Sequence, residues 1–200
     1  MSTQTENTSN LLLAAAWRRL ARGDAARLVD VAKDAGVSRQ ALYLHFGSRV
    51  GLLVALTRHI DKTLGLDVML REVAAIPSPR ERLLAALRVS ARYAPKIQSV
   101  AMALARLRPV DADARAAFDE RMEYRRQGIR RILHAIARDG GLASEWNVRR
   151  ATDALWAAGS PQTWELLVTE RGWSPKEFER WLVRQGTAML APIPKRRTSG

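Results

Sequence analysis

Two neighbouring side chains near the N-terminus, Arg39 and Gln40, have the chemistry that reads DNA bases. A guanidinium can donate two hydrogen bonds to O6 and N7 of guanine, and a glutamine amide can pair with N6 and N7 of adenine. Tyr43 and His45 follow one turn later and add polar ring atoms. This grouping predicts a nucleic-acid contact, on the condition that the segment folds as an exposed helical face.

The residues around this group predict two short helices joined by a turn. Leu28, Val31, Ala32 and Ala35 recur at helical spacing, and Gly36 can adopt the left-handed conformation that ends a helix. Ser38 is a suitable N-cap for a second helix, which would end at Gly47. Such a pair of helices is the unit that inserts its second helix into the major groove.

A plainer interpretation is that Gly36, Ser38 and Gly47 only cap helices within a buried bundle. Capping holds in both interpretations. A buried bundle, however, would not place Arg39, Gln40 and Tyr43 on one short exposed face. We therefore favour a DNA-binding helix.

Composition excludes several other functions. The chain has no cysteine, so disulfides, thiolate metal sites and cysteine nucleophiles are excluded. His45, His59 and His134 are too far apart in sequence to suggest a metal site, and neither a nucleophile-elbow motif nor a phosphate-binding glycine loop is present. We expect no enzymatic activity, no cofactor and no metal. The net charge of +13 suits a polyanionic partner but is spread along the whole chain.

The remaining sequence predicts an all-α fold. Alanine, leucine and arginine dominate, and no segment shows sustained apolar–polar alternation. Glycine and proline divide the chain into about nine helices. The expected ranges are 9–21, 28–35, 38–47, 48–64, 79–94, 95–107, 112–139, 143–170 with an interruption at 159–161, and 175–189.

The segment from Val31 to Leu53 resembles the signature of the TetR family of bacterial repressors. It contains Val-Ala, then Ala-Gly-Val-Ser, then Leu-Tyr-Leu-His-Phe, then Ser-Arg and a leucine pair. The sequence departs from the family pattern at Ala26-Arg27, where a threonine often begins the second helix, and at Val50, where an acidic residue is usual. The resemblance implies an N-terminal three-helix DNA-binding domain followed by a larger helical domain for ligand binding and dimerisation.

The resemblance also implies particular DNA contacts. The predicted base-contacting residues are Ser38, Arg39 and Gln40. The predicted phosphate-contacting residues are Arg27, Tyr43, His45 and Arg49. Arg49 replaces the family's lysine at the start of a helix, where backbone N–H groups and the helix dipole also favour phosphate. These contacts would bind double-stranded DNA at a palindromic operator.

For the larger domain, the resemblance implies a homodimer and a small-molecule effector. The predicted effector pocket comprises Tyr93, Met102, Met122, Tyr124 and Trp156. The predicted dimer interface comprises Leu155, Trp164, Leu167, Val168, Phe178, Trp181, Leu182, Gln185 and Met189. Methionine and aromatic residues at helical spacing equally suit a monomer core, so that alternative stays open.

The predicted organisation has four parts. These are a disordered segment at 1–10, a helix-turn-helix DNA-binding domain with its connecting fourth helix at 11–64, an effector-binding and dimerisation domain at 65–191, and a disordered basic tail at 192–200. No apolar run suits a signal peptide or a membrane span, so we expect a cytoplasmic protein without a membrane partner. The alternative is an architectural protein that binds nucleic acid without sequence preference.

Overall fold

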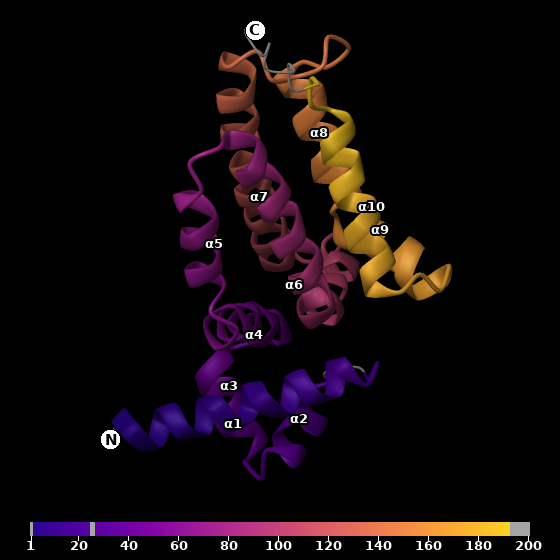
Figure 1. The fold of residues 1–200 in the computed structure, drawn as a ribbon. Helices are drawn as coiled ribbons and strands as arrows, with labels where there is room; N and C mark the ends of the chain where they lie inside the picture. The colour runs from indigo at the N-terminus through magenta and orange to yellow at the C-terminus, as the bar shows by residue number, and fades with distance from the viewer. Residues whose placement is uncertain (1, 25–26, 193–200) are drawn as a thin grey trace, which may run out of the picture. The chain divides into compact units, whose positions relative to one another are not determined.

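The computed structural model describes residues 2–24 and 27–192, and over these residues the fold is all-α, as predicted (Figure 1). A π-helical segment, η1, continues directly from α9. The elements are α1 (Ser2–Ala21), α2 (Leu28–Asp34), α3 (Arg39–Phe46), α4 (Arg49–Thr63), α5 (Leu66–Ala75), α6 (Pro79–Leu107), α7 (Ala112–Arg138), α8 (Val148–Ala158), α9 (Pro161–Trp164), η1 (Glu165–Glu170) and α10 (Pro175–Ala188).

The N-terminal segment differs from the prediction. Residues 1–10 were expected to be disordered, but α1 begins at Ser2. Extending an existing helix requires no new nucleus, so polar residues can continue it without an apolar face of their own. The predicted basic tail at 192–200 lies outside the described residues from position 193 onward.

Two helix boundaries also differ from the prediction. α5 was not predicted; Gly65, at φ 65°, separates it from α4. Pro95 was expected to begin a new helix but lies inside α6, which continues through it. A proline removes one backbone hydrogen bond from a helix, a loss that packing along the rest of a long helix can offset.

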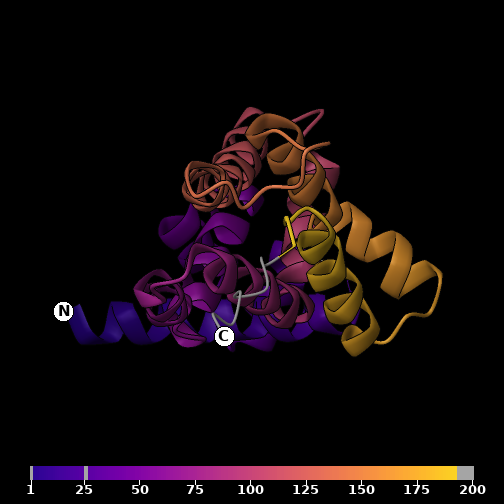
Figure 2. The same ribbon diagram turned by 45° about the horizontal axis from the view of Figure 1, so that its top comes forward.

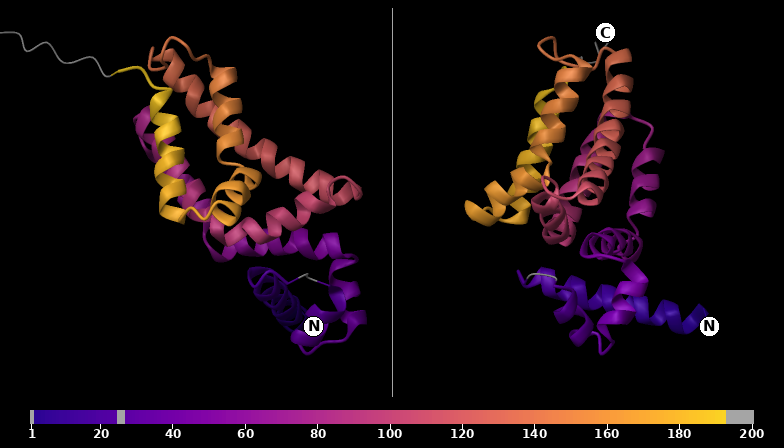
Figure 3. Two further views of the ribbon diagram at one scale, coloured as in Figure 1. Left: turned by 90° about the vertical axis from the view of Figure 1, so that its right-hand side faces the viewer. Right: turned by 180° about the vertical axis from the view of Figure 1, so that it is seen from behind.

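The chain packs as two compact units. The head unit comprises Met1–Asp67 and Pro95–Arg121, and the body unit comprises Val68–Ala94 and Met122–Gly200. Residues 95–121, predicted to belong to the second domain, therefore pack in the head unit. Within this unit α1 contacts α2, α3 and α4 (Figure 3). Its helices enclose a core of fully buried side chains: Leu12, Ala15, Ala16, Val31, Leu42, Leu52, Leu53, Leu56 and Ile60.

The body unit has a separate apolar core. α10 contacts both α8 and η1, and Figure 2 shows α10 beside the orange α9–η1 segment. α10 begins with the predicted capping box between Ser174 and Glu177. The core includes Leu83, Leu87, Leu133, Ile136, Leu155, Phe178 and Leu182.

Alanine substitutions at Gly186 and Gly128 should change the free energy of unfolding in opposite directions. A Cβ atom at Gly186, a buried position in α10, would overlap the Leu87 side chain, whereas at Gly128 in α7 nothing lies within 4 Å. We expect Gly186→Ala to lower the free energy of unfolding by about 1–2 kcal/mol, because overpacking outweighs the gain in helix propensity. Gly128→Ala should raise it by about 1 kcal/mol, because only the propensity changes. Urea denaturation of both variants checks this, and equal signs would contradict it.

Candidate nucleic-acid interface

The turn between α2 and α3 has the geometry that the sequence predicts. Gly36 adopts φ 67°, and the Val37 N–H donates to the Ala32 carbonyl at 3.0 Å while the Gly36 N–H donates to the Lys33 carbonyl at 3.1 Å. These bonds close the end of α2 with a left-handed residue, which is the usual role of glycine there. The turn therefore ends α2 sharply and lets α3 begin in a new direction.

Serine side chains cap both α3 and α4. The Ser38 Oγ accepts a hydrogen bond from the Ala41 N–H at 3.1 Å, and the Ser48 Oγ accepts one from the Gly51 N–H at 3.0 Å. Each cap satisfies one of the backbone donors that a helix start leaves without a partner. The Ser38 oxygen therefore already accepts a hydrogen bond within the chain. Its hydroxyl hydrogen can still be donated to a DNA base.

The outward face of α3 carries the predicted base-reading pair. Arg39 and Gln40 are both exposed. The Arg39 Nη2 donates to the Tyr43 Oη at 3.2 Å, and the guanidinium carbon lies 5.3 Å from the centroid of the Tyr43 ring. Arg39 and Tyr43, predicted to contact base and phosphate separately, therefore form one assembly on the helix surface.

Leu44 is a residue of this face for which the sequence predicted no contact. It lies on α3 beside Tyr43 and is 81% exposed. His45, in contrast, is half-buried, and its ring centroid lies 5.9 Å from that of Phe46. A leucine beside polar base-reading groups is the one signal that could have identified Leu44, because thymine offers a methyl group in the major groove.

Arg49, at the start of α4, has an unsatisfied donor. The residue is half-buried, and its Nε is enclosed without a hydrogen-bond acceptor among the described residues. Arg49 is also the first residue of a helix, where N–H groups and the positive dipole end attract anions. The position combines a guanidinium with a helix N-terminus, which suits an oxygen of a phosphate.

Arg27, a predicted phosphate contact, is exposed but has a carboxylate partner on α2. Its Nε donates to Asp30 at 2.8 Å, and Arg19 from α1 forms ion pairs with Asp30 at 3.6 Å and Asp34 at 2.6 Å. The hydrogen bond from Arg19 lowers the pKa of Asp34 below its ordinary value. The carboxylates of α2 therefore already neutralise two head-unit cations, and one of them is the predicted phosphate contact.

Comparison with known proteins identifies this arrangement. Residues 12–56, which run from the middle of α1 to the middle of α4, match the bacterial regulatory proteins of the tetR family. This N-terminal part of the chain therefore resembles the helix-turn-helix region of TetR regulators. An HTH-type transcriptional regulator of Mycobacterium tuberculosis strain H37Rv is 34% identical over 91 residues, which cover 44% of this chain and 45% of that relative.

Solved structures of transcriptional regulators resemble this chain in fold over most of its length. A transcriptional regulator from Saccharomonospora viridis in complex with choline has a TM-score of 0.78 at 20% identity, covering 96% of this chain and all of that one. FadR from Bacillus subtilis in complex with stearoyl-CoA has a TM-score of 0.69 at 16% identity, covering 90% and 98%. At these identities the likeness concerns the fold.

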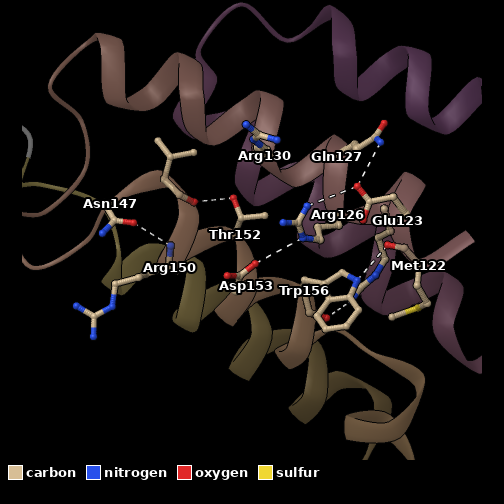
Figure 4. Close-up of polar contacts among 12 residues, drawn as sticks. Met122, Glu123, Arg126, Gln127, Arg130, Asn147, Arg150, Thr152, Asp153 and Trp156 are labelled. Carbon is tan, nitrogen blue, oxygen red and sulfur yellow. Dashed lines mark hydrogen bonds and ion pairs between the residues drawn. The ribbon is translucent and has the colours of Figure 1, made fainter. Parts of the chain in front are cut away.

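The residues predicted for an effector pocket differ in burial and in the unit to which they belong. Trp156 donates from Nε1 to the Met122 carbonyl at 3.0 Å (Figure 4), and Tyr93 is buried in the same unit. Tyr124 is 61% exposed, so it does not line an enclosed space. Met102 is half-buried and belongs to the head unit. Helical spacing alone could not distinguish the inward positions of α7 from its surface.

A cavity of about 250 Å³ in the body unit lies elsewhere. Its walls include Ser78, Arg80, Asp139 and Pro192, and none of the predicted pocket residues lines it. The Arg80 Nη1 donates to the carbonyls of Gly141 and Ala191. This guanidinium therefore binds backbone oxygens and holds the segment after α10 in place.

The residues predicted for the dimer interface fall into two groups by their burial in the single chain. The structure buries several of its members inside the core of a single chain, where they have no surface for a partner: Leu155, Trp164, Phe178, Leu182 and Met189. The other members stay half-buried at the surface of η1 and α10: Leu167, Val168, Trp181 and Gln185. The sequence could not separate these groups, because core and interface use the same residue types.

No helix among the described residues is long and apolar enough to cross a membrane.

Proposed function

We propose that this protein is a TetR-type repressor that binds a palindromic operator as a homodimer and is released by a small-molecule effector. The observation that carries the proposal is the outward face of α3, where Arg39 and Gln40 project from a helix with well-formed caps. Repression itself is the activity that the family resemblance implies. A head of this size makes few contacts alone, so pairing two heads on an inverted repeat supplies affinity and specificity.

The proposed contacts divide into two kinds. Arg39 and Gln40 read base edges, and the methyl groups of Leu44 contact a thymine methyl. Arg49 binds a phosphate through its guanidinium and the N-terminus of α4, which fixes the register of the head on the duplex. His45 is proposed as a second phosphate contact. Ser38 contributes its hydroxyl hydrogen. Arg27 contributes the Nη groups of its exposed guanidinium, while its Nε stays bonded to Asp30.

The proposed dimer uses the half-exposed apolar residues at the surface of η1 and α10. Leu166 is 54% exposed and lies next to Leu167 and Val168, while Trp181 is half-buried on the neighbouring helix. Aromatic side chains at such a surface are favoured in protein interfaces. A second copy of the chain is the partner that the palindrome requires.

The proposed effector binds in the body unit. Structures of similar fold contain choline in one case and stearoyl-CoA in the other. These ligands differ in charge and size, so they support a ligand-binding body without indicating the ligand. Trp156 and Met122, which the structure brings together, are the predicted pocket residues retained in the proposal.

Selection of bound fragments from randomly sheared genomic DNA, followed by sequencing, tests the function. We expect one inverted repeat to be enriched. Arg39→Ala should relax the preference at one position of each half-site, with a loss of about 1–3 kcal/mol of discrimination. Arg49→Ala should weaken binding about equally on all sequences. Recovery of all fragments alike by the wild-type protein would instead support the architectural alternative.

A further inference from the structure

Arg39 does not project freely from α3, because the side chain one turn later holds it. Tyr43 accepts a hydrogen bond from the Arg39 Nη2 at its Oη, 3.2 Å away. The guanidinium carbon lies 5.3 Å from the ring centroid, within the range of a cation–π interaction. Tyr43 is itself 40% exposed, so the pair stands on the surface that faces outward.

This contact restricts a flexible group before any DNA is bound. An arginine side chain has about 2 kcal/mol of rotamer entropy to lose, and a planar guanidinium reads guanine only in one orientation. The Tyr43 ring and hydroxyl oppose motion of the guanidinium in two different ways, by stacking and by hydrogen bonding. Part of the ordering cost of a bidentate contact is therefore met within the free protein.

Gln40 provides an internal comparison on the same helix turn. Its side chain is exposed and forms no hydrogen bond with the described residues. It must therefore be ordered entirely by the base that it contacts. The restriction applies to the arginine of the base-reading pair and not to the glutamine.

We propose that Tyr43 is a positioning residue for Arg39 and thereby determines base specificity at the position that Arg39 reads. The proposal deepens the proposed function and rests on it. The family resemblance assigns Tyr43 a phosphate contact, which would hold the protein on any sequence equally. The hydroxyl hydrogen of Tyr43 is still free to reach a phosphate, so the two roles are distinguished by base preference and not by affinity.

A double-mutant cycle on the selected operator tests the positioning role. Arg39→Ala should reduce the preference for guanine at its position by about 10- to 100-fold. Tyr43→Leu removes ring and hydroxyl and should reduce the same preference at least fivefold, whereas Tyr43→Phe keeps the stacking and should reduce it less. In the Arg39→Ala background, Tyr43→Leu should change this preference no further. A uniform loss of affinity that adds to that of Arg39→Ala would overturn the proposal.

A measurement without DNA separates this inference from the proposed function. The aromatic ring should shift the Arg39 side-chain proton resonances upfield in the NMR spectrum of the free protein, and Tyr43→Leu should abolish that shift. Leu44→Ala, at the neighbouring exposed position, should leave it unchanged. Absence of the upfield shift in the wild type would overturn the positioning role alone. Absence of any preferred operator would overturn the proposed function, and with it the role of Tyr43 in base specificity.

Discussion

Phe178→Ala is expected to lower the free energy of unfolding by about 3–5 kcal/mol, which is the usual cost of truncating a buried phenylalanine. Phe178 is 1% exposed and packs between Trp164, with ring centroids 4.8 Å apart, and Trp181, at 5.7 Å. The cavity left behind would remove aromatic contacts on two sides. Thermal or urea denaturation of the variant, monitored by circular dichroism, measures the loss.

Trp181→Ala is the matched control, because the two residues are neighbours on α10 but differ in burial. Trp181 is half-buried, and we expect its removal to weaken self-association more than it destabilises the single chain. Sedimentation analysis over a range of protein concentrations measures association. If Phe178→Ala instead left the chain stable and only dissociated a dimer, its assignment to the monomer core would be wrong.

Leu42→Ala and Leu44→Ala should differ in their effect on stability, although both leucines belong to α3. Leu42 is fully buried in the head unit, so its truncation should cost about 2–5 kcal/mol of stability and abolish DNA binding through unfolding. Leu44 is exposed, so its truncation should change stability by less than about 0.5 kcal/mol. Its expected effect is a weaker complex on the selected operator.

Denaturation and operator binding, measured on both leucine variants, check this pair. Normal binding by a stable Leu44→Ala variant would show that Leu44 contacts no base. Full stability of Leu42→Ala would contradict the packing of α3 against the head core.

The head could be predicted closely because local chemistry determines it. Gly36 has the positive φ expected of a helix end, and Ser38 and Ser48 make the capping bonds that their positions suggested. These features depend on neighbours within a few residues. The hydrogen bond between Arg39 and Tyr43 also spans one helical turn. It could not be predicted, because i, i+4 spacing indicates that two side chains are close but not that they form a hydrogen bond.

The body could not be predicted at the same level because its contacts are long-range. Arg125 on α7 is an example: it donates to the carbonyls of Trp156 and Gly159 at the end of α8, and burial lowers its pKa to about 10. In sequence, Arg125 is one arginine among several on a helix that looks solvent-exposed. Nothing local distinguishes a guanidinium that caps another helix from its neighbour Arg126, which forms partly exposed ion pairs.

The ion pairs of α2 have a consequence for how salt affects binding. Cations that meet phosphates displace condensed counterions from DNA, and their number determines how steeply affinity falls as salt rises. Arg19 and Arg27 already have carboxylate partners in Asp30 and Asp34, so they displace few such ions. We therefore expect substitution of Arg19 or Arg27 to change the salt dependence of DNA binding less than substitution of Arg49.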